Sequence, residues 1–353
     1  MTSKVTLKDI ASEMNISRST VHRALNGKEG VNGSLRTRIC ETAEEMGYKA
    51  NYVASSLKRK PVRLAVVLPQ KEGRGRLYHK YFWDAVEGFF SEAVNLNTFI
   101  ECHSFDEESN EQYDILNKLL EGEETVDGLL TMPAKNTERM FYMISRFHDR
   151  NIPVVLIDND LPGTNRLCCI APHDELIGRL GAEILTKITK TSGKILVAAG
   201  NLDNASHRCN LNGFREFTEH NGEEFEIVEV HEYGNFQKIY DQARKILDEV
   251  KGIVAFYAVT ARDTLPLCQA VIDSGLASKI SGVGSDLYPE SAKLLKEDVV
   301  QALIYKNAFD KGLEGFRVLF DYVVKNIAPK DDCIIVPISV IMKSNLIFFE
   351  QYL

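Results

Sequence analysis

The first fifty residues carry apolar side chains at intervals of three and four positions, which is the spacing of one helix face. This pattern predicts helices over residues 5–14, 18–25 and roughly 34–46. Ser17 is a suitable N-cap for the second helix, and Gly47 is a suitable end for the third. Because only a short turn separates the first two, the pattern indicates a helix-turn-helix.

After residue 62 the pattern changes to short apolar runs that alternate with helical stretches. The runs read VRLAVVLP, TFIECHSF, VDGLLTMP, IPVVLID, GKILVAAG, FEIVEVHEY, KGIVAFYA, KISGVGSD and VVQALIY. Continuous apolar runs indicate strands buried on both faces, as in parallel sheets covered by helices. A stretch of about 280 residues is too long for one small sheet, so we expect two α/β lobes.

The charge of the chain is divided unevenly along its length. The whole chain has a net charge of −8, which alone would argue against nucleic acid as a partner. Residues 1–60, however, hold eleven Lys and Arg against six Asp and Glu, a net of +5, and the remainder carries −13. A basic head on an acidic body is typical of a DNA-binding domain joined to a domain of another kind.

The second predicted helix presents an unusually polar face for its length. Its apolar side is formed by Val21, Ala24 and Leu25, and the opposite side carries two arginines, a serine and a histidine. Arginine can clamp a guanine, and Ser and Thr can contact bases or phosphates. A helix that enters the major groove needs such a face; the alternative is a small three-helix bundle with a solvated polar surface.

Residues 5–60 resemble the head of the lactose-repressor/galactose-repressor family of bacterial transcription regulators. The resemblance rests on VTLKDIA, on IS, TV and RALNG in and around the second helix, and on GY and VA with SL further on. It implies operator DNA as a partner, base reading by Arg18, Ser19 and Arg23, and backbone contacts by Thr6, Ser17, Thr20 and Asn26. His22 stands where the family usually has Ser, so we add it to the DNA-contacting positions.

Residues 51–61 form the junction between head and body. Their apolar stripe and basic run are compatible with a solvated linker, because an isolated helix this short is marginal in water. The resemblance instead implies a hinge helix that folds over DNA, where Leu57 wedges into the minor groove beside Ala54. Ala50 replaces the proline that is common in the family.

Residues 62–343 resemble the periplasmic-binding-protein-like effector domain of the same family. The resemblance implies two lobes joined by three crossing strands. The first lobe would span about 62–160 and 304–328, the second about 161–303 and 329–343. Residues 1–50 would be the DNA-binding domain, 51–61 the hinge and 344–353 a C-terminal tail.

The resemblance also implies where a small effector would bind. Ligands of open α/β sheets bind beyond the carboxyl ends of the strands. Asn210 stands where the family normally has a ligand-clamping Arg, and Arg208 lies two positions earlier. The expected ligand-binding residues are Tyr81, Phe82, Trp83, Asp158, Arg208, Asn210, Thr260, Asp286 and Lys306.

Other chemistry has little support in the sequence. Neither a dinucleotide-binding or phosphate-binding glycine loop nor a nucleophile–base motif is present. The seven cysteines include no C-x-x-C pair, so adjacent Cys168 and Cys169 are interpreted as small buried hydrophobic residues. We therefore expect no metal, no cofactor and no catalytic residues, and neither a membrane span nor a secretory signal, which favours the cytoplasm.

The sequence thus predicts a transcription regulator, with repression as the expected mode. It would bind a near-palindromic operator as a homodimer, because the tail lacks the sustained heptads of a tetramerising coiled coil. The effector would be a sugar or a sugar derivative. Two alternatives stay open: a DNA-binding regulator that senses no ligand, and an enzyme built on the α/β body.

Overall fold

A computed structural model describes residues 5–25, 29–48, 60–122, 124–135, 137–221 and 225–353. The head contains the three expected helices, α1 (Leu7–Glu13), α2 (Arg18–Leu25) and α3 (Gly33–Glu45). They pack around the fully buried side chains of Ile10, Val21 and Ile39. The hinge residues Ala54 and Leu57, and Asn26 after α2, lie outside the described residues.

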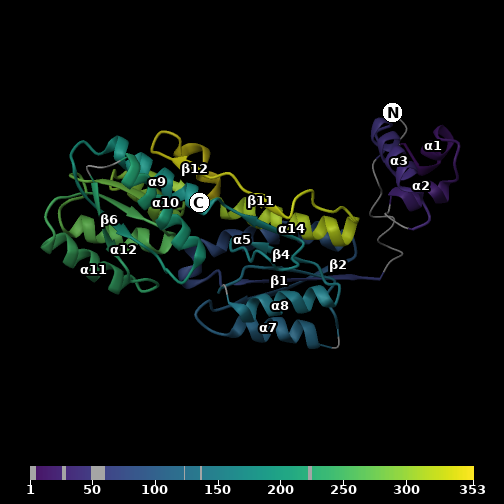
Figure 1. The fold of residues 1–353 in the computed structure, drawn as a ribbon, viewed down its shortest axis with the longest axis horizontal. Coiled ribbons are helices and arrows are strands. Elements are labelled where there is room, and N and C mark those ends of the chain that lie inside the picture. Colours follow the sequence, from purple (N-terminus) through teal and green to yellow (C-terminus); the bar gives the residue numbers. More distant parts are fainter. Residues whose placement is uncertain (1–4, 26–28, 49–59, 123, 136, 222–224) are drawn as a thin grey trace.

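The first lobe is built on a six-stranded parallel sheet of order β11-β5-β4-β3-β1-β2. These strands are β1 (Val62–Pro69), β2 (Thr98–Phe105), β3 (Gly128–Thr131), β4 (Val154–Ile157), β5 (Cys168–Ala171) and β11 (Cys333–Ile335). One face packs against α5 (His79–Glu87), α6 (Phe90–Asn95) and α14 (Ala308–Lys325), and the other against α7 (Glu111–Glu121) and α8 (Glu138–Asp149) (Figure 1). The 3-10 turn η1 (Gly73–Leu77) precedes α5.

The second lobe repeats this arrangement with the order β12-β10-β9-β8-β6-β7. Its strands are β6 (Gly193–Ala198), β7 (Phe225–Val230), β8 (Ile253–Ala258), β9 (Ser281–Ser285), β10 (Ala302–Tyr305) and the antiparallel β12 (Ser339–Ile341). Helices α9 (Asp174–Ile188) and α10 (Ala205–Asn221) cover one face, and α11 (Phe236–Glu249), α12 (Ala261–Asp273) and α13 (Pro289–Lys296) the other. The tail turns η2 (Leu346–Phe348) and η3 (Glu350–Tyr352) pack onto this lobe.

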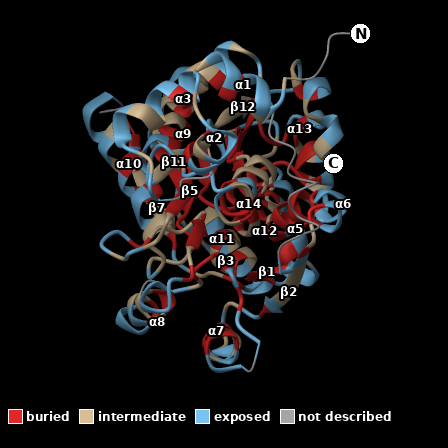
Figure 2. Ribbon diagram, turned by 90° about the vertical axis from the view of Figure 1, so that its right-hand side faces the viewer, coloured by how far each residue is buried: buried red, intermediate tan, exposed pale blue. Residues whose placement is uncertain are grey.

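The central strands of both sheets are buried on both faces, as the unbroken apolar runs require. Buried residues, drawn in red, concentrate along the strands and on the helix faces turned toward them (Figure 2). Cys168 and Cys169 belong to this core as free thiols in β5, in agreement with their interpretation as small hydrophobic residues. No helix among the described residues is both long enough and apolar enough to span a bilayer.

The chain crosses from one lobe to the other at different residues from those expected from the sequence. β5 (168–171) and β11 (333–335) belong to the first sheet, although both were assigned to the second lobe. β10, which includes residues 304 and 305, belongs to the second sheet. The crossings therefore lie at 172–173, 306–307 and 336–338. The expected lobe bounds were implied by the family resemblance, and neither β5 nor β11 lies within one of the nine apolar runs recognised in the sequence.

Candidate functional site

Helix α2 presents its polar face to solvent. Arg18, Ser19, His22 and Arg23 are all exposed, whereas Val21 and Ala24 are buried in the head. The first turn is fixed by hydroxyl groups, because the Ser17 Oγ lies 2.8 Å from the hydroxyls of both Ser19 and Thr20. The Ser17 Oγ also accepts the Thr20 N–H at 3.1 Å, which is the expected N-cap. The predicted reading surface is thus exposed to solvent, and its first turn is locally ordered.

Thr6 is another residue of the head that is expected to contact the DNA backbone, and it lies at the start of α1. Its backbone N–H and its hydroxyl both donate to the Asp9 carboxylate at 2.7 Å, which closes a capping box. Thr6 is exposed as well. Its position therefore leaves it available to a phosphate beside the N-terminus of α1.

A polar cleft lies between the lobes, at the carboxyl ends of both sheets. The side chains that line it follow β1, β2, β3, β4 and β5 in the first lobe, β6, β7, β8 and β9 in the second, and β10 at a crossing. Its lining residues are Tyr78, His79, Glu107, Met132, Asp158, Asn159, Asp174, Asn204, Ser206, His207, Tyr233, Thr260, Ala261, Arg262, Asp286 and Lys306.

Two aspartates occupy matched places in the two lobes. Asp158 follows β4 and Asp286 follows β9, and both have left-handed backbone conformations with φ of 66° and 63°. The N–H of Asp158 donates to the Ile170 carbonyl at 2.8 Å, and that of Asp286 to the Ile304 carbonyl at 2.9 Å. A left-handed conformation is unfavourable for residues with a Cβ and is found at sites where the surrounding structure imposes it. Both carboxylates are thereby held in the lining of the cleft.

Each of these aspartates has its own lysine. Lys306, at the second crossing, places its Nζ 3.0 Å from Asp286 Oδ2, and its backbone N–H donates to Oδ1 at 3.1 Å. Burial would lower the pKa of Lys306, but Asp286 and Asp158 raise it, so the side chain remains an ammonium. Lys311 of α14 is fully buried and donates to both Asp158 and the Tyr78 hydroxyl.

Tyr78 connects the two ion pairs. Its hydroxyl donates to Asp158 at 2.7 Å, and the ammonium groups of Lys306 and Lys311 each lie 5.0 Å from its ring centroid. Burial opposes the charge of Asp158, but Lys311 and the Tyr78 hydroxyl hold its pKa below the usual value. The floor of the cleft is therefore a compact, charge-paired network around one aromatic ring.

Ion pairs also close one rim of the cleft. Arg262, at the start of α12 in the second lobe, donates to Glu107, which follows β2 in the first. Its other Nη atom lies 3.2 Å from the Tyr233 hydroxyl. Nearby, Arg76 Nη2 lies 2.6 Å from Glu290 Oε1 and joins η1 to α13. The lobes are thus bridged at the rim by charged side chains, and the cleft encloses only about 50 Å³.

Asp174 has a different environment from the other carboxylates of the cleft. It is the first residue of α9, and its Oδ1 accepts from the Ser206 hydroxyl at 2.6 Å. Burial raises its pKa to about 6, because the Ser206 hydrogen bond and the distant lysines do not offset it. Asp174 also lines a second cavity of about 260 Å³ that adjoins the cleft.

Two histidines complete the lining and are neutral at pH 7. Burial lowers the pKa of His207 to about 3, and Lys306 adds to the shift. Its Nδ1 accepts the Asn201 N–H at 3.0 Å, which orients the ring. Burial also lowers the pKa of His79. Neutral imidazoles can donate and accept hydrogen bonds, as polar ligands require.

The structure brings four of the nine expected ligand residues into the cleft: Asp158, Thr260, Asp286 and Lys306. Thr260 is the N-cap residue of α12, and its Oγ accepts the Asp263 N–H at 3.2 Å. The strand-end rule placed these residues well, because all four directly follow a strand or its first loop residue.

The other five expected ligand residues lie elsewhere, and these are corrections. Tyr81, Phe82 and Trp83 point into the first-lobe core, where the Trp83 indole donates to the Pro69 carbonyl at 2.8 Å. The aromatic residue of this segment that lines the cleft is Tyr78, just before α5. Arg208 is exposed and donates to the Leu202 carbonyl at 2.6 Å. Asn210 is buried and accepts from the Tyr257 hydroxyl at 2.9 Å.

Several residues that line the cleft were not predicted from the sequence: Tyr78, His79, Glu107, Asp174, His207 and Tyr233. Glu107, Asp174 and Tyr233 lie within three residues of a strand end, so a uniform search of strand ends would have found them. Tyr78, His79 and His207 lie at least nine residues beyond a strand, at or within a helix, where such a search does not reach. Asp174 was hidden because β5 was not recognised. Lys311 carried no signal, since a lysine within a helix normally faces solvent.

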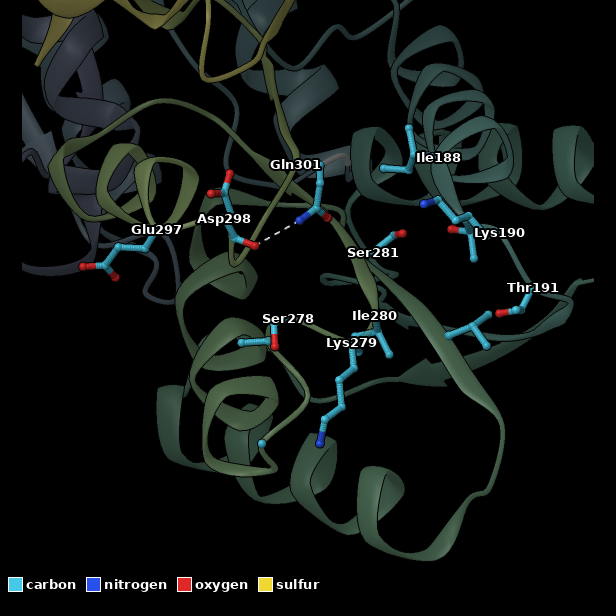
Figure 3. Close-up of a pocket in the computed structure, with 14 residues that line it drawn as sticks. Ile188, Lys190, Thr191, Ser278, Lys279, Ile280, Ser281, Glu297, Asp298 and Gln301 are labelled. Carbon is cyan, nitrogen blue, oxygen red and sulfur yellow. Dashed lines mark hydrogen bonds between the residues drawn. The ribbon is translucent and has the colours of Figure 1, made fainter.

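A separate cavity lies at the opposite end of the second lobe. It encloses about 650 Å³ between the end of α9, the β9 entry and the loop before β10. In Figure 3 the side chains of Lys190, Lys279 and Glu297 spread apart around it, and the Gln301 amide donates to the Asp298 carbonyl at 3.0 Å. With no buried charge among its lining residues, this hollow lacks the convergent polar groups of the cleft. Within the described ranges, no cluster of His, Cys, Asp or Glu is arranged to hold a metal ion.

Comparison with known proteins identifies the class to which the chain belongs. Residues 76–326, well over half of the chain, match the periplasmic binding protein domain family. Residues 6–51 match the bacterial regulatory proteins of the lacI family. The chain therefore belongs to the periplasmic-binding-protein domain family and carries a lacI-family head. It is a DNA-binding regulator of transcription.

Individual relatives agree with this assignment. Catabolite control protein A of Streptococcus mutans is 26% identical over 331 residues, which cover 89% of this chain and 90% of the relative. The glucose-galactose binding protein GanP of Geobacillus stearothermophilus superposes with a TM-score of 0.70 at 20% identity, over 82% of this chain and 99% of that one. A solute binding protein of Burkholderia graminis in complex with D-arabinose gives 0.71 at 16% identity, over 81% and 97%. At these identities the two structures support the fold alone.

Proposed function

We propose that this protein is a repressor that binds a near-palindromic operator as a homodimer and is controlled by a sugar or sugar derivative held in the interlobe cleft. The observation that carries the proposal is the combination, in one chain, of an exposed reading helix with a closable polar cleft. Its site of action is the cytoplasm, where the DNA is. The solved structures similar to the body include the glucose-galactose binding protein and the D-arabinose complex named above.

The geometry of α2 supports the DNA-binding part of the proposal. In a helix-turn-helix the N-terminal residues of the second helix reach base edges, while flanking hydroxyls contact phosphates. Arg18, Ser19 and His22 are exposed on one side of α2, and Arg23 lies one turn beyond Ser19. In this proposal the arginines read guanines, and Thr6, Ser17, Thr20 and Asn26 contact the backbone. The hinge residues Ala54 and Leu57 would contact the minor groove.

Arg23→Ala is expected to weaken binding to the preferred operator by about 1–3 kcal/mol and to relax specificity at one base pair of each half-site. Selection of duplexes from a random pool by the full chain, followed by titration of the enriched sequence, measures both effects. Lys8→Ala removes an exposed cation from α1 outside the reading face and is the matched control. Equal weakening on all sequences would assign Arg23 to phosphate contacts and contradict base reading.

The cleft supports the ligand-controlled part of the proposal. Its walls come from both lobes, so a molecule bound there contacts both and changes their equilibrium separation. A cavity of about 50 Å³ is smaller than the roughly 300–1,000 Å³ of most ligand sites. Entry of a sugar therefore requires the lobes to part at the rim, and the crossings at 172–173, 306–307 and 336–338 transmit the change.

Glu107→Gln is expected to favour the open arrangement by about 1.5–3 kcal/mol, because it removes the charged partner of Arg262 across the rim. Small-angle scattering of the full chain without ligand should show a larger radius of gyration. Glu87→Gln is the matched control, since Glu87 pairs with Lys71 inside the first lobe at 2.6 Å. Unchanged dimensions in Glu107→Gln would show that the rim pairs do not hold the lobes together.

Two other functions are distinguished by simple measurements. A regulator that senses no ligand would show the same melting temperature with every small molecule, whereas a ligand at 100 times its dissociation constant adds about 2.7 kcal/mol of stability. An enzyme would convert a bound sugar, which mass analysis of the incubated ligand would reveal. The relatives found are regulators of transcription rather than enzymes.

A further inference from the structure

The carboxylates of the cleft are not all balanced by cations. Asp158 is paired with Lys311, Asp286 with Lys306, and Glu107 with Arg262. Asp160, beside the cleft, is held by Arg166, whose Nη2 lies 2.7 Å from Oδ2. Asp174 has the Ser206 hydroxyl as its hydrogen-bond partner and no cation within 4 Å among the described residues.

The cavity beside Asp174 has the size and lining for part of a ligand. It encloses about 260 Å³ and adjoins the cleft through Asp158, Asn159, Asp174, Asn204 and Ser206, which line both. Its remaining walls are Pro133, Ala134, Asp160, Leu161, Pro162, Ala205 and Cys209. No Lys or Arg lines this cavity, and its apolar wall includes two prolines and Leu161.

We infer that this cavity is the amine-recognising end of the effector site, and that the effector is an amino sugar or a related polyol carrying an ammonium group. The inference rests on the proposed function and specifies its ligand. A ligand ammonium would supply to Asp174 the cation that the protein supplies to every other carboxylate around it. Asn159 and Asn204 would accept or donate hydrogen bonds to ligand hydroxyls.

A neutral sugar would leave this charge unbalanced. Hydroxyl groups can donate to Asp174, but they do not neutralise it, and closure of the lobes over an unpaired carboxylate carries a desolvation penalty. An anionic sugar would add repulsion to the same place. A ligand that carries an ammonium group favours closure of the lobes because it balances the unpaired negative charge of Asp174. The cleft therefore selects cationic ligands.

The test uses the full chain and three hexosamines, glucosamine, galactosamine and mannosamine, each beside its parent hexose and its N-acetyl derivative. N-acetylation keeps the nitrogen but removes its charge. Calorimetric titration should show one hexosamine binding about 10-fold or more tightly than both of its neutral counterparts. Asp174→Asn keeps the oxygen that accepts from Ser206, so the variant should fold and should bind the amine no better than the parent hexose.

Asp203→Asn is the matched control, because it removes the same charge from an exposed position just before α10. Its amine preference should equal that of the unaltered chain. Tighter binding of a parent hexose or of an N-acetyl derivative than of any hexosamine overturns the inference and leaves the proposed function standing. No binding by any member of the panel counts against both.

Discussion

Replacing Lys311 with Met lowers the free energy of unfolding of the body by about 3–5 kcal/mol. Lys311 is fully buried, and its ammonium contacts Asp158 and the Tyr78 hydroxyl, so its removal leaves a buried carboxylate without its cation. Met is close to Lys in length and apolar, which keeps the loss of packing small. The loss of stability therefore comes mainly from leaving the Asp158 carboxylate unpaired in the low-dielectric interior.

A double-mutant cycle separates charge from packing. Asp158→Asn in the Lys311→Met background removes the stranded charge and should restore part of the lost stability, whereas each single substitution destabilises. Denaturant unfolding of the four proteins provides the comparison. Lys80→Met, at an exposed lysine that pairs with Asp84 on α5, is the control and should change little. Additive losses in the cycle would contradict the coupling of Lys311 with Asp158.

Gly178→Ala is expected to destabilise the second lobe by about 3 kcal/mol or more. Helices α9 and α10 cross so closely here that a Cβ on Gly178 would lie 1.7 Å from the Asn210 carbonyl oxygen. That atom belongs to the backbone, so the helices themselves would have to separate. Because Asp174 and Ser206 lie at the starts of these two helices, the substitution should also weaken ligand binding.

Thermal unfolding of the body checks this expectation. Arg179→Ala is the control on the neighbouring position of α9: Arg179 is exposed, and its nearest carboxylates are 3.9 Å away, so its loss should cost less than about 0.5 kcal/mol. An unchanged melting temperature for Gly178→Ala would show that α9 and α10 tolerate a wider separation than their contact implies.

The strongly patterned elements were the ones that the sequence could predict. The three head helices appear where the apolar spacing placed them, and each of the nine apolar runs contains an observed strand. The alternation of strands and helices also predicted two parallel sheets. β3, β4 and β10 are as short as β5, but each lies within one of the longer apolar runs. β5 was missed because its two cysteines were interpreted only as small hydrophobic residues, and β11 and β12 because three residues show too little pattern. The expected lobe boundaries were wrong for the same reason, because β5 and β11 belong to the first sheet and the chain crosses to the second lobe only after each of them.

The directions of the side chains in the site were harder to predict from the sequence than the positions of the residues. The position of Asp158 and Asp286 follows from topology, because a residue after a parallel strand reaches the ligand edge. The direction of Trp83 depends on its place on α5 relative to the core, whereas the cleft-facing Tyr78 lies just before that helix. Asn210 is buried because α9 passes within contact distance, and only the tertiary structure shows that approach.

The central claim is that occupation of the cleft changes DNA binding. The most direct measurement is the affinity of the full chain for its selected operator, titrated with and without the ligand that binds most tightly in the calorimetric panel. The account predicts a change of about 5-fold or more, equal in size to the change that the operator causes in ligand affinity. Operator affinity that stays the same at saturating ligand would contradict the account, because the head and the cleft would then work independently.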